Sequence, residues 1–98
     1  MSAPPVDRIR ELLMRAVHEI QTLSGRDPGV VSGSTRPLAE LDDFDSLNAI
    51  EVVAQTSVEL NTDLPEEVFA PHADGTAATL DEIAHRIFRH LERTQNGA

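Results

Sequence analysis

The fold is decided by the stretch DFDSLNAIEVV, residues 43–53. Asp45 is a residue type preferred at helix N-caps, and apolar side chains follow it at helical spacing. We therefore expect the second helix of the chain to begin at Asp45 and to continue to Leu60, before Asn61. This places the hydroxyl of Ser46 in the first turn of a helix, directly after a long irregular segment.

The apolar residues of this helix are spread broadly around its axis. Four of them form a main stripe, and three further apolar residues lie off it. The stripe contains Leu47, Ile50, Val53 and Ala54, and the residues off it are Ala49, Val52 and Val58. Such a spread predicts a central helix that is contacted on several sides.

An amphipathic helix is predicted from Val6 to Leu23, because apolar residues fall on one face at helical spacing. We interpret its charged face as solvated, with Glu11 and Arg15 ordered for an ion pair one turn apart. Residues 24–43 are rich in glycine and proline, so we expect a long ordered loop there. The residues expected to anchor this loop recur every three positions: Leu38, Leu41 and Phe44.

A short helical turn is predicted over Pro65 to Ala70, with Pro65 as its starting residue. Phe69 is the one large apolar residue of the connector formed by residues 69–78. We expect Phe69 to fold into the core, because a lone aromatic ring among small residues is usually buried.

A last helix is predicted from the Thr-x-x-Glu pattern of Thr79 and Glu82, which is typical of a capping box. Its apolar residues continue at helical spacing, and the tail from Thr94 to Ala98 is expected to fray. The residues expected to be buried where the second and last helices meet are Ile50, Val53, Ile83 and Ile87.

The composition is that of an acidic, aliphatic chain of 98 residues, with 17 acidic against 8 basic residues and a net charge of −9. Such a surface repels nucleic acids and anionic membranes. Cysteine is absent, which excludes a disulfide framework, a thiolate nucleophile and a cysteine metal site. No apolar run suits a signal peptide or a membrane span, so we expect a cytoplasmic monomer without membrane insertion. One domain is expected over residues 1–98, with an ordered core of about 6–93 and short flexible tails.

The stretch 43–53, followed by LPEE at residues 64–67, closely resembles the core of acyl carrier proteins. The resemblance runs without a gap from about Leu38 to Glu67, and the flanking helices agree with the family's four-helix order. It implies an all-α four-helix bundle, with three main helices, one short helix and a long loop between helices 1 and 2.

The resemblance also implies a function for Ser46. In the family, a phosphopantetheinyl transferase attaches 4′-phosphopantetheine from coenzyme A to this serine, which Asp45 and Leu47 flank here. The arm holds acyl intermediates as thioesters and delivers them to partner enzymes of fatty acid, polyketide or other specialised biosynthetic pathways. The protein itself would not be an enzyme.

Partner enzymes of the family read the exposed side of the second helix, where carboxylates frame apolar residues. Acyl-loading, condensing or transferring enzymes with basic patches are the expected partners. Ser57 and Val58 stand where typical fatty-acid members carry acids, and the connector after Glu66 is longer, which argues against housekeeping fatty acid synthesis. The residues implied in partner contact are Leu47, Glu51, Ala54, Glu66 and Glu67.

Other functions stay open at the level of sequence. A peptidyl or aminoacyl carrier protein shares the architecture, and an unmodified interaction module could keep a carrier-like fold. Ser46 could also be a direct nucleophile if one of the four histidines approached it, but no serine-enzyme motif is present. No metal site is expected, because each candidate pair supplies only two ligands. These pairs are His72 with Asp74, and Glu82 with His85.

Overall fold

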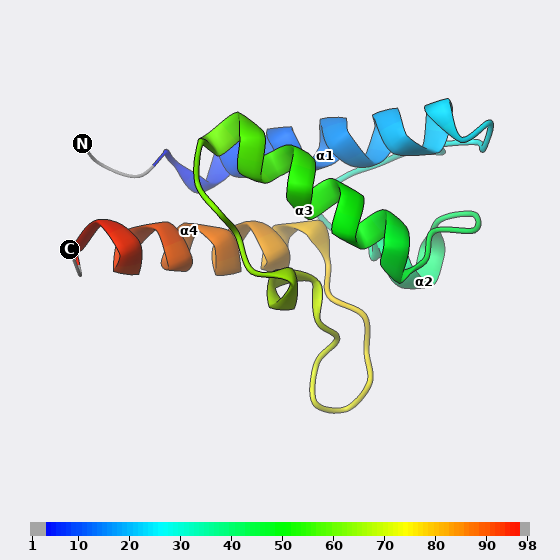
Figure 1. Cartoon of the computed structure of the whole chain (residues 1–98). Helices are drawn as coiled ribbons and strands as arrows, with labels where there is room; N and C mark the ends of the chain where they lie inside the picture. Colours follow the sequence, from blue (N-terminus) through cyan, green and yellow to red (C-terminus); the bar gives the residue numbers. More distant parts are fainter. Residues whose placement is uncertain (1–3, 97–98) are drawn as a thin grey trace.

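Helices account for all the regular structure in residues 4–96, the part of the chain described by the computed structural model (Figure 1). They are α1 (Val6–Leu23), α2 (Pro37–Glu40), α3 (Ser46–Leu60), the 3-10 helix η1 (Glu66–Phe69) and α4 (Leu80–Asn96). The predicted all-α bundle of three main helices is therefore confirmed. Among the described residues, no helix combines the length and apolar character needed to cross a bilayer.

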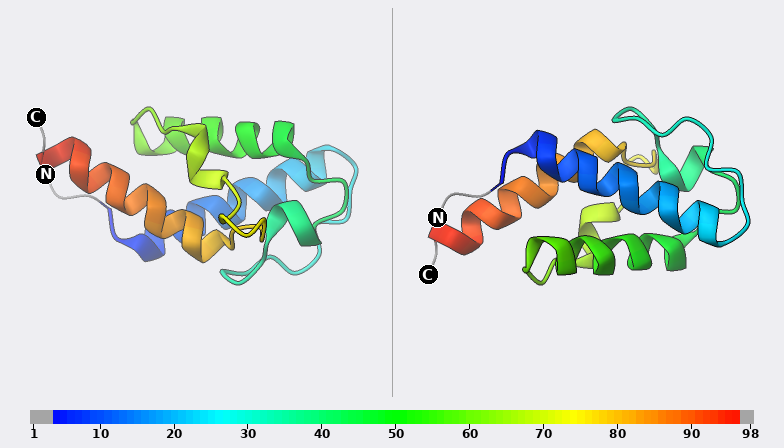
Figure 2. Two further views of the ribbon diagram at one scale, coloured as in Figure 1. Left: turned by 90° about the horizontal axis from the view of Figure 1, so that it is seen from below. Right: turned by 90° about the horizontal axis from the view of Figure 1, so that it is seen from above.

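Helix α1 packs against both α3 and α4 and runs in the opposite direction to each (Figure 1). On the other side, η1 packs against α3 and α4 and lies between them (Figure 2). The predicted meeting of α3 with α4 is thus made mainly through α1 and η1. Val53, Ile83 and Ile87 are buried as expected, but Ile50 is 41% exposed, so its predicted burial was wrong.

Helix α3 buries one face only, which corrects the prediction of a central helix with a broad apolar surface. Leu47 is 67% exposed, Val58 is 79% exposed, and Ala54 is also exposed. The buried face contains two polar residues, which hid its periodicity in the sequence; Thr56 satisfies its hydroxyl by donating to the Val52 carbonyl at 2.8 Å. The residues of this face are Asn48, Ala49, Val52, Val53 and Thr56.

The helix ends largely match the predictions. Helix α1 has its predicted bounds, although Leu23, at its last position, is 83% exposed. Among the described residues Glu11 pairs with Arg8 instead of with Arg15. Helix α4 extends to Asn96, three residues beyond the predicted ordered core. The tail residues 1–3 and 97–98 lie outside the described part of the chain.

The segment between α1 and α3 contains α2, a helix that the prediction of an unbroken loop missed. Pro37 occupies its first turn, where a missing amide proton costs nothing. Of the predicted anchors, Phe44 is buried, and Leu38 and Leu41 are partly buried against the core. The carbonyl of Thr35 accepts from the first amide of α4 at 2.9 Å, which fixes this segment to the start of α4.

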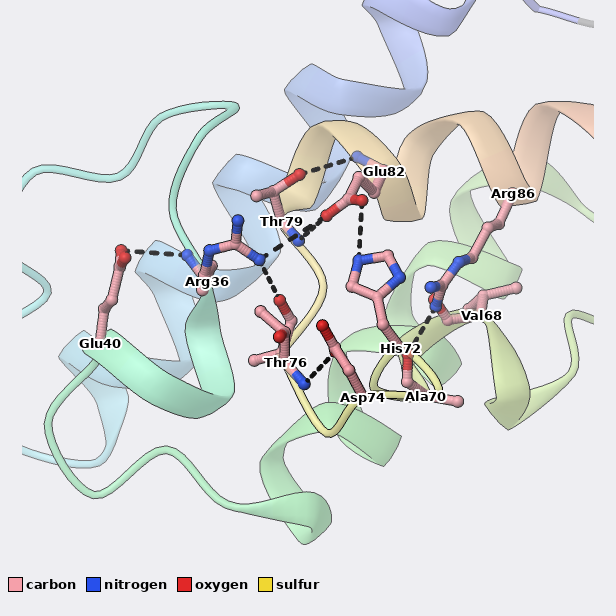
Figure 3. A network of polar contacts seen from close by, with 11 residues as sticks. Arg36, Glu40, Val68, Ala70, His72, Asp74, Thr76, Thr79, Glu82 and Arg86 are labelled. Atoms are coloured by element: carbon pink, nitrogen blue, oxygen red, sulfur yellow. Dashed lines mark hydrogen bonds and ion pairs between the residues drawn. The ribbon is translucent and has the colours of Figure 1, made fainter.

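The connector of residues 69–78 is held onto the start of α4 by polar contacts (Figure 3). The predicted capping box is confirmed, because the Thr79 amide donates to Glu82 Oε1 at 2.9 Å and the Glu82 amide donates to Thr79 Oγ1 at 3.1 Å. Glu82 also pairs with His72 Nε2 at 2.8 Å. Arg36 donates to the Ala77 carbonyl, and Arg86 donates to the carbonyls of Val68 and Ala70 (Figure 3).

The contacts of Glu82 with Thr79 and His72 predict that part of the stability of the protein is lost in acid. The Thr79 amide and, next, His72 lower the pKa of Glu82 from 4.5 to about 2. A carboxyl whose pKa is depressed on folding stabilises the protein above its unfolded pKa, and this stabilisation is lost as the pH falls through the folded pKa. We expect Glu82→Gln to show a shallower loss of stability than wild type between pH 4.5 and about 2, measured by urea unfolding at a series of pH values.

A matched control for this measurement is Glu92→Gln, which removes a charge from an exposed position of the same helix. It should keep the wild-type slope of unfolding free energy against pH. Parallel curves for Glu82→Gln and wild type over this pH range would show that the Thr79 and His72 contacts do not stabilise the ionised carboxyl.

Candidate functional site

Ser46 is the first residue of α3, and its side chain is exposed. The capping is done by its neighbours: Asp45 Oδ1 accepts from the amides of Leu47 at 3.0 Å and Asn48 at 3.1 Å. Asn48 Oδ1 in turn accepts from the Asp45 amide at 3.1 Å, which completes a capping box. Since these two side chains satisfy the helix start, the Ser46 hydroxyl has no hydrogen-bond partner within residues 4–96 and is available for chemistry.

The electrostatic surroundings of Ser46 are mixed. The N-terminus of α3 presents the positive end of a helix dipole, which favours an attached anion. Asp42, Asp43 and Asp45 are exposed beside it and oppose that effect. Asp43 has φ of 51°, in the left-handed region that aspartate tolerates better than most residues. A phosphodiester at Ser46 would therefore be tolerated without being clamped by these side chains.

An apolar pocket of about 210 Å³ opens beside Ser46, between α3 and η1. Its floor includes Phe69, which is buried as predicted and stacks against Phe44 with ring centroids 6.3 Å apart. The remaining lining is aliphatic except at the rim, where Ser46 and Glu66 supply polar atoms. The full lining is Leu38, Ser46, Ala49, Ile50, Val53, Glu66, Phe69, Ala70 and Pro71.

The residues predicted to contact partners are all exposed, and they lie on the two elements that border this pocket. Leu47, Glu51 and Ala54 belong to α3, and Glu66 and Glu67 belong to η1. Contacts between α3 and η1 bring these elements side by side. Of these five residues only Glu66 lines the pocket, and the other four are exposed elsewhere on the same two elements.

The four histidines contribute no side chain to the lining of this pocket. Within the described residues, Ser46 therefore has no adjacent imidazole base. His72 pairs with Glu82, and His85 Nδ1 lies 2.8 Å from the Asp81 carbonyl. No group of three or more metal-ligating side chains is assembled within the described part of the chain.

Three residues near Ser46 were missed at the level of sequence: Gln21, Arg26 and Asn48. Arg26 Nη1 donates to Gln21 Oε1 at 3.2 Å and to Asn48 Oδ1 at 3.0 Å. The guanidinium of Arg26 therefore lies at the start of α3, where the residues next to Ser46 in sequence are acidic. The signal that was available is Gly25 directly after the first helix, because such a glycine commonly reverses the chain there.

Comparisons with known proteins identify no relative. No protein-family model matches the chain, no curated protein matches it, and no solved structure matches it.

Proposed function

We propose that this protein is an acyl carrier protein, which holds acyl or related intermediates as thioesters on 4′-phosphopantetheine attached to Ser46. One observation carries the proposal: an exposed serine hydroxyl without a hydrogen-bond partner in the described chain stands at the start of α3, at the rim of an apolar pocket. This arrangement suits a serine that is modified by another enzyme and then presents an apolar cargo.

The modification is a phosphoryl-group transfer. Ser46 Oγ forms a bond to the β-phosphorus of coenzyme A, and the P–O bond of its pyrophosphate breaks. Adenosine bisphosphate leaves, and the hydroxyl proton passes to a base of the phosphopantetheinyl transferase. The chain contains no cysteine, so the thiol that carries the acyl group comes entirely from the attached arm.

The exposed acidic residues of α3 and η1 suit partners with basic patches. Exposed charge pairs steer association more than they add affinity, so Glu51, Glu66 and Glu67 would orient a partner enzyme toward Ser46. Such partners include the transferase and acyl-loading, condensing or transferring enzymes of a fatty acid, polyketide or other specialised pathway. We place the protein in the cytoplasm, where coenzyme A and these enzymes would meet it.

Intact-mass spectrometry tests the proposal directly. The protein is incubated with coenzyme A and a promiscuous phosphopantetheinyl transferase, starting from material whose mass is that of the unmodified chain. We expect a single mass increase equal to one phosphopantetheinyl group, located at Ser46 by fragmentation. An unchanged mass under conditions that modify a reference carrier would overturn the proposal and favour an unmodified interaction module.

Reversing the charge at Glu51 should slow productive contact with a basic partner without unfolding the protein. Glu51 is exposed one turn beyond Ser46, and an exposed charge pair is worth about 0 to 1 kcal/mol. We expect Glu51→Arg to lower kcat/KM for modification at low salt by up to about fivefold. At high salt the kcat/KM values of Glu51→Arg and wild type should become similar, because salt screens the attraction between wild type and its partner.

The control is Glu92→Arg, which makes the same charge change at an exposed position of α4. It should stay close to wild type at both salt concentrations. Equal rates for Glu51→Arg and wild type at low salt would show that Glu51 does not contact the partner enzyme.

A further inference from the structure

A polar cluster of Gln21, Arg26 and Asn48 joins the end of α1 to the start of α3. Gln21 and Asn48 are buried, and Arg26 is partly buried. Every buried side-chain nitrogen and oxygen in the described residues has a hydrogen-bond partner, so this cluster is internally satisfied. Satisfied buried polar groups rigidify the segments they connect, because breaking one bond leaves a desolvated partner behind.

The sequence places Arg26 in this cluster through the turn that ends α1. Gly25 has φ of 76°, a left-handed conformation that glycine adopts without strain. The Gly25 amide donates to the Thr22 carbonyl at 3.1 Å, and the Arg26 amide donates to the Gln21 carbonyl at 2.9 Å. These two bonds form a Schellman motif, which turns the chain back over the last turn of α1. The side chain of Arg26 is thereby brought beside Gln21.

The cluster holds the segment before Ser46 at two points. Gln21 Nε2 donates to the Asp42 carbonyl at 2.8 Å. Asn48 Oδ1 accepts from the Asp45 amide at 3.1 Å while it also accepts from Arg26 at 3.0 Å. Arg26 Nη1 therefore links Gln21, which binds the Asp42 carbonyl, to Asn48, which belongs to the capping box of α3.

This segment needs such a link to keep one conformation. The carboxylates of Asp42, Asp43 and Asp45 lie close together in sequence and are exposed, so their charges repel. Asp43 also has φ of 51°, a left-handed conformation that aspartate tolerates but that still costs a non-glycine residue free energy.

We propose that Arg26 is a positioning residue for the modification of Ser46, holding residues 42–48 in the conformation that the transferase binds. This inference rests on the proposed function. Arg26 acts through Gln21 and Asn48, so its loss should lower the fraction of protein that is ready to bind. Apparent affinity falls in proportion to that fraction, whereas the reaction of the bound complex is unaffected. KM should therefore rise while kcat stays the same.

Steady-state kinetics of modification with coenzyme A and a promiscuous transferase test this with two substitutions. Arg26→Met keeps the aliphatic stem and removes the donors, and we expect KM for the carrier to rise about tenfold with kcat unchanged. Arg26→Lys keeps a nitrogen that can donate to both acceptors, so most of the loss should be recovered. The control is Arg15→Met, which removes an exposed charge from α1 and should leave KM at the wild-type value.

Amide hydrogen exchange supplies a readout that is independent of the transferase. Exchange at Asp45, Leu47 and Asn48 should be faster in Arg26→Met than in wild type, with the amides in the middle of α1 unchanged. Should Arg26→Met lose its helical circular dichroism, Gln21→Met breaks the link at the Asp42 carbonyl instead and should raise KM in the same way.

The outcomes separate the two proposals. If wild type is modified and Arg26→Met has the wild-type KM, the positioning role is overturned and the carrier function stands. A lower kcat at constant KM, or a lysine variant as impaired as the methionine variant, also overturns it. If wild type is not modified at all, the carrier function fails and the role of Arg26 fails with it.

Discussion

Replacing Ser46 with alanine is expected to abolish attachment of phosphopantetheine while leaving the fold intact. The Ser46 hydroxyl is the only atom that the change removes, and it makes no hydrogen bond in the described chain. The start of α3 is capped by Asp45 and Asn48, so the helix loses no cap. Intact mass after incubation with coenzyme A and the transferase should equal that of the unmodified chain.

The matched control is Ser24→Ala, which removes another exposed hydroxyl at a helix end. It should be modified to the same extent as wild type. A phosphopantetheinyl mass on the Ser46→Ala protein would show that another residue is the attachment site. Thermal unfolding of both variants should stay close to wild type, because surface substitutions of this kind usually change stability by about 0.5 kcal/mol or less.

Local features of the fold could be predicted from the sequence. The N-cap at Asp45 and the capping box of Thr79 with Glu82 depend on residues three positions apart, so their pattern is complete within a few residues. The burial of Phe69 was also predictable, because few positions nearby could supply packing. The exposed position of Ser46 followed from the predicted start of α3, without knowledge of the remaining fold.

Features that depend on distant residues could not be predicted in the same way. The polar residues Asn48 and Thr56 are buried on α3 beside Val53, and the partner of Asn48 comes from a distant part of the chain. Arg26 reaches Asn48 across 22 positions of sequence. The contact of Arg26 with Asn48 therefore depends on the packing of α1 against α3, which a local sequence pattern does not predict.

Replacing Ile83 with alanine should cause the largest loss of stability among these substitutions. Ile83 is in α4 and is 0% exposed, within the core cluster that α1, α3 and η1 share with it. Truncating a buried isoleucine to alanine costs about 2 to 5 kcal/mol, since transfer free energy is lost and a cavity remains. The free energy of unfolding of a small domain is about 5 to 15 kcal/mol in total, so the substitution should remove a large part of it.

Urea unfolding followed by circular dichroism measures this loss, with Val58→Ala as the control. Val58 is 79% exposed on α3, so the same kind of truncation there removes little buried surface and should leave the midpoint nearly unchanged. The two midpoints can be compared directly if the dependence of free energy on urea is equal, which indicates similar surface exposed on unfolding. Equal midpoints for the two variants would contradict the packing of α4 described above, because Ile83 would then contribute no more than a solvated side chain.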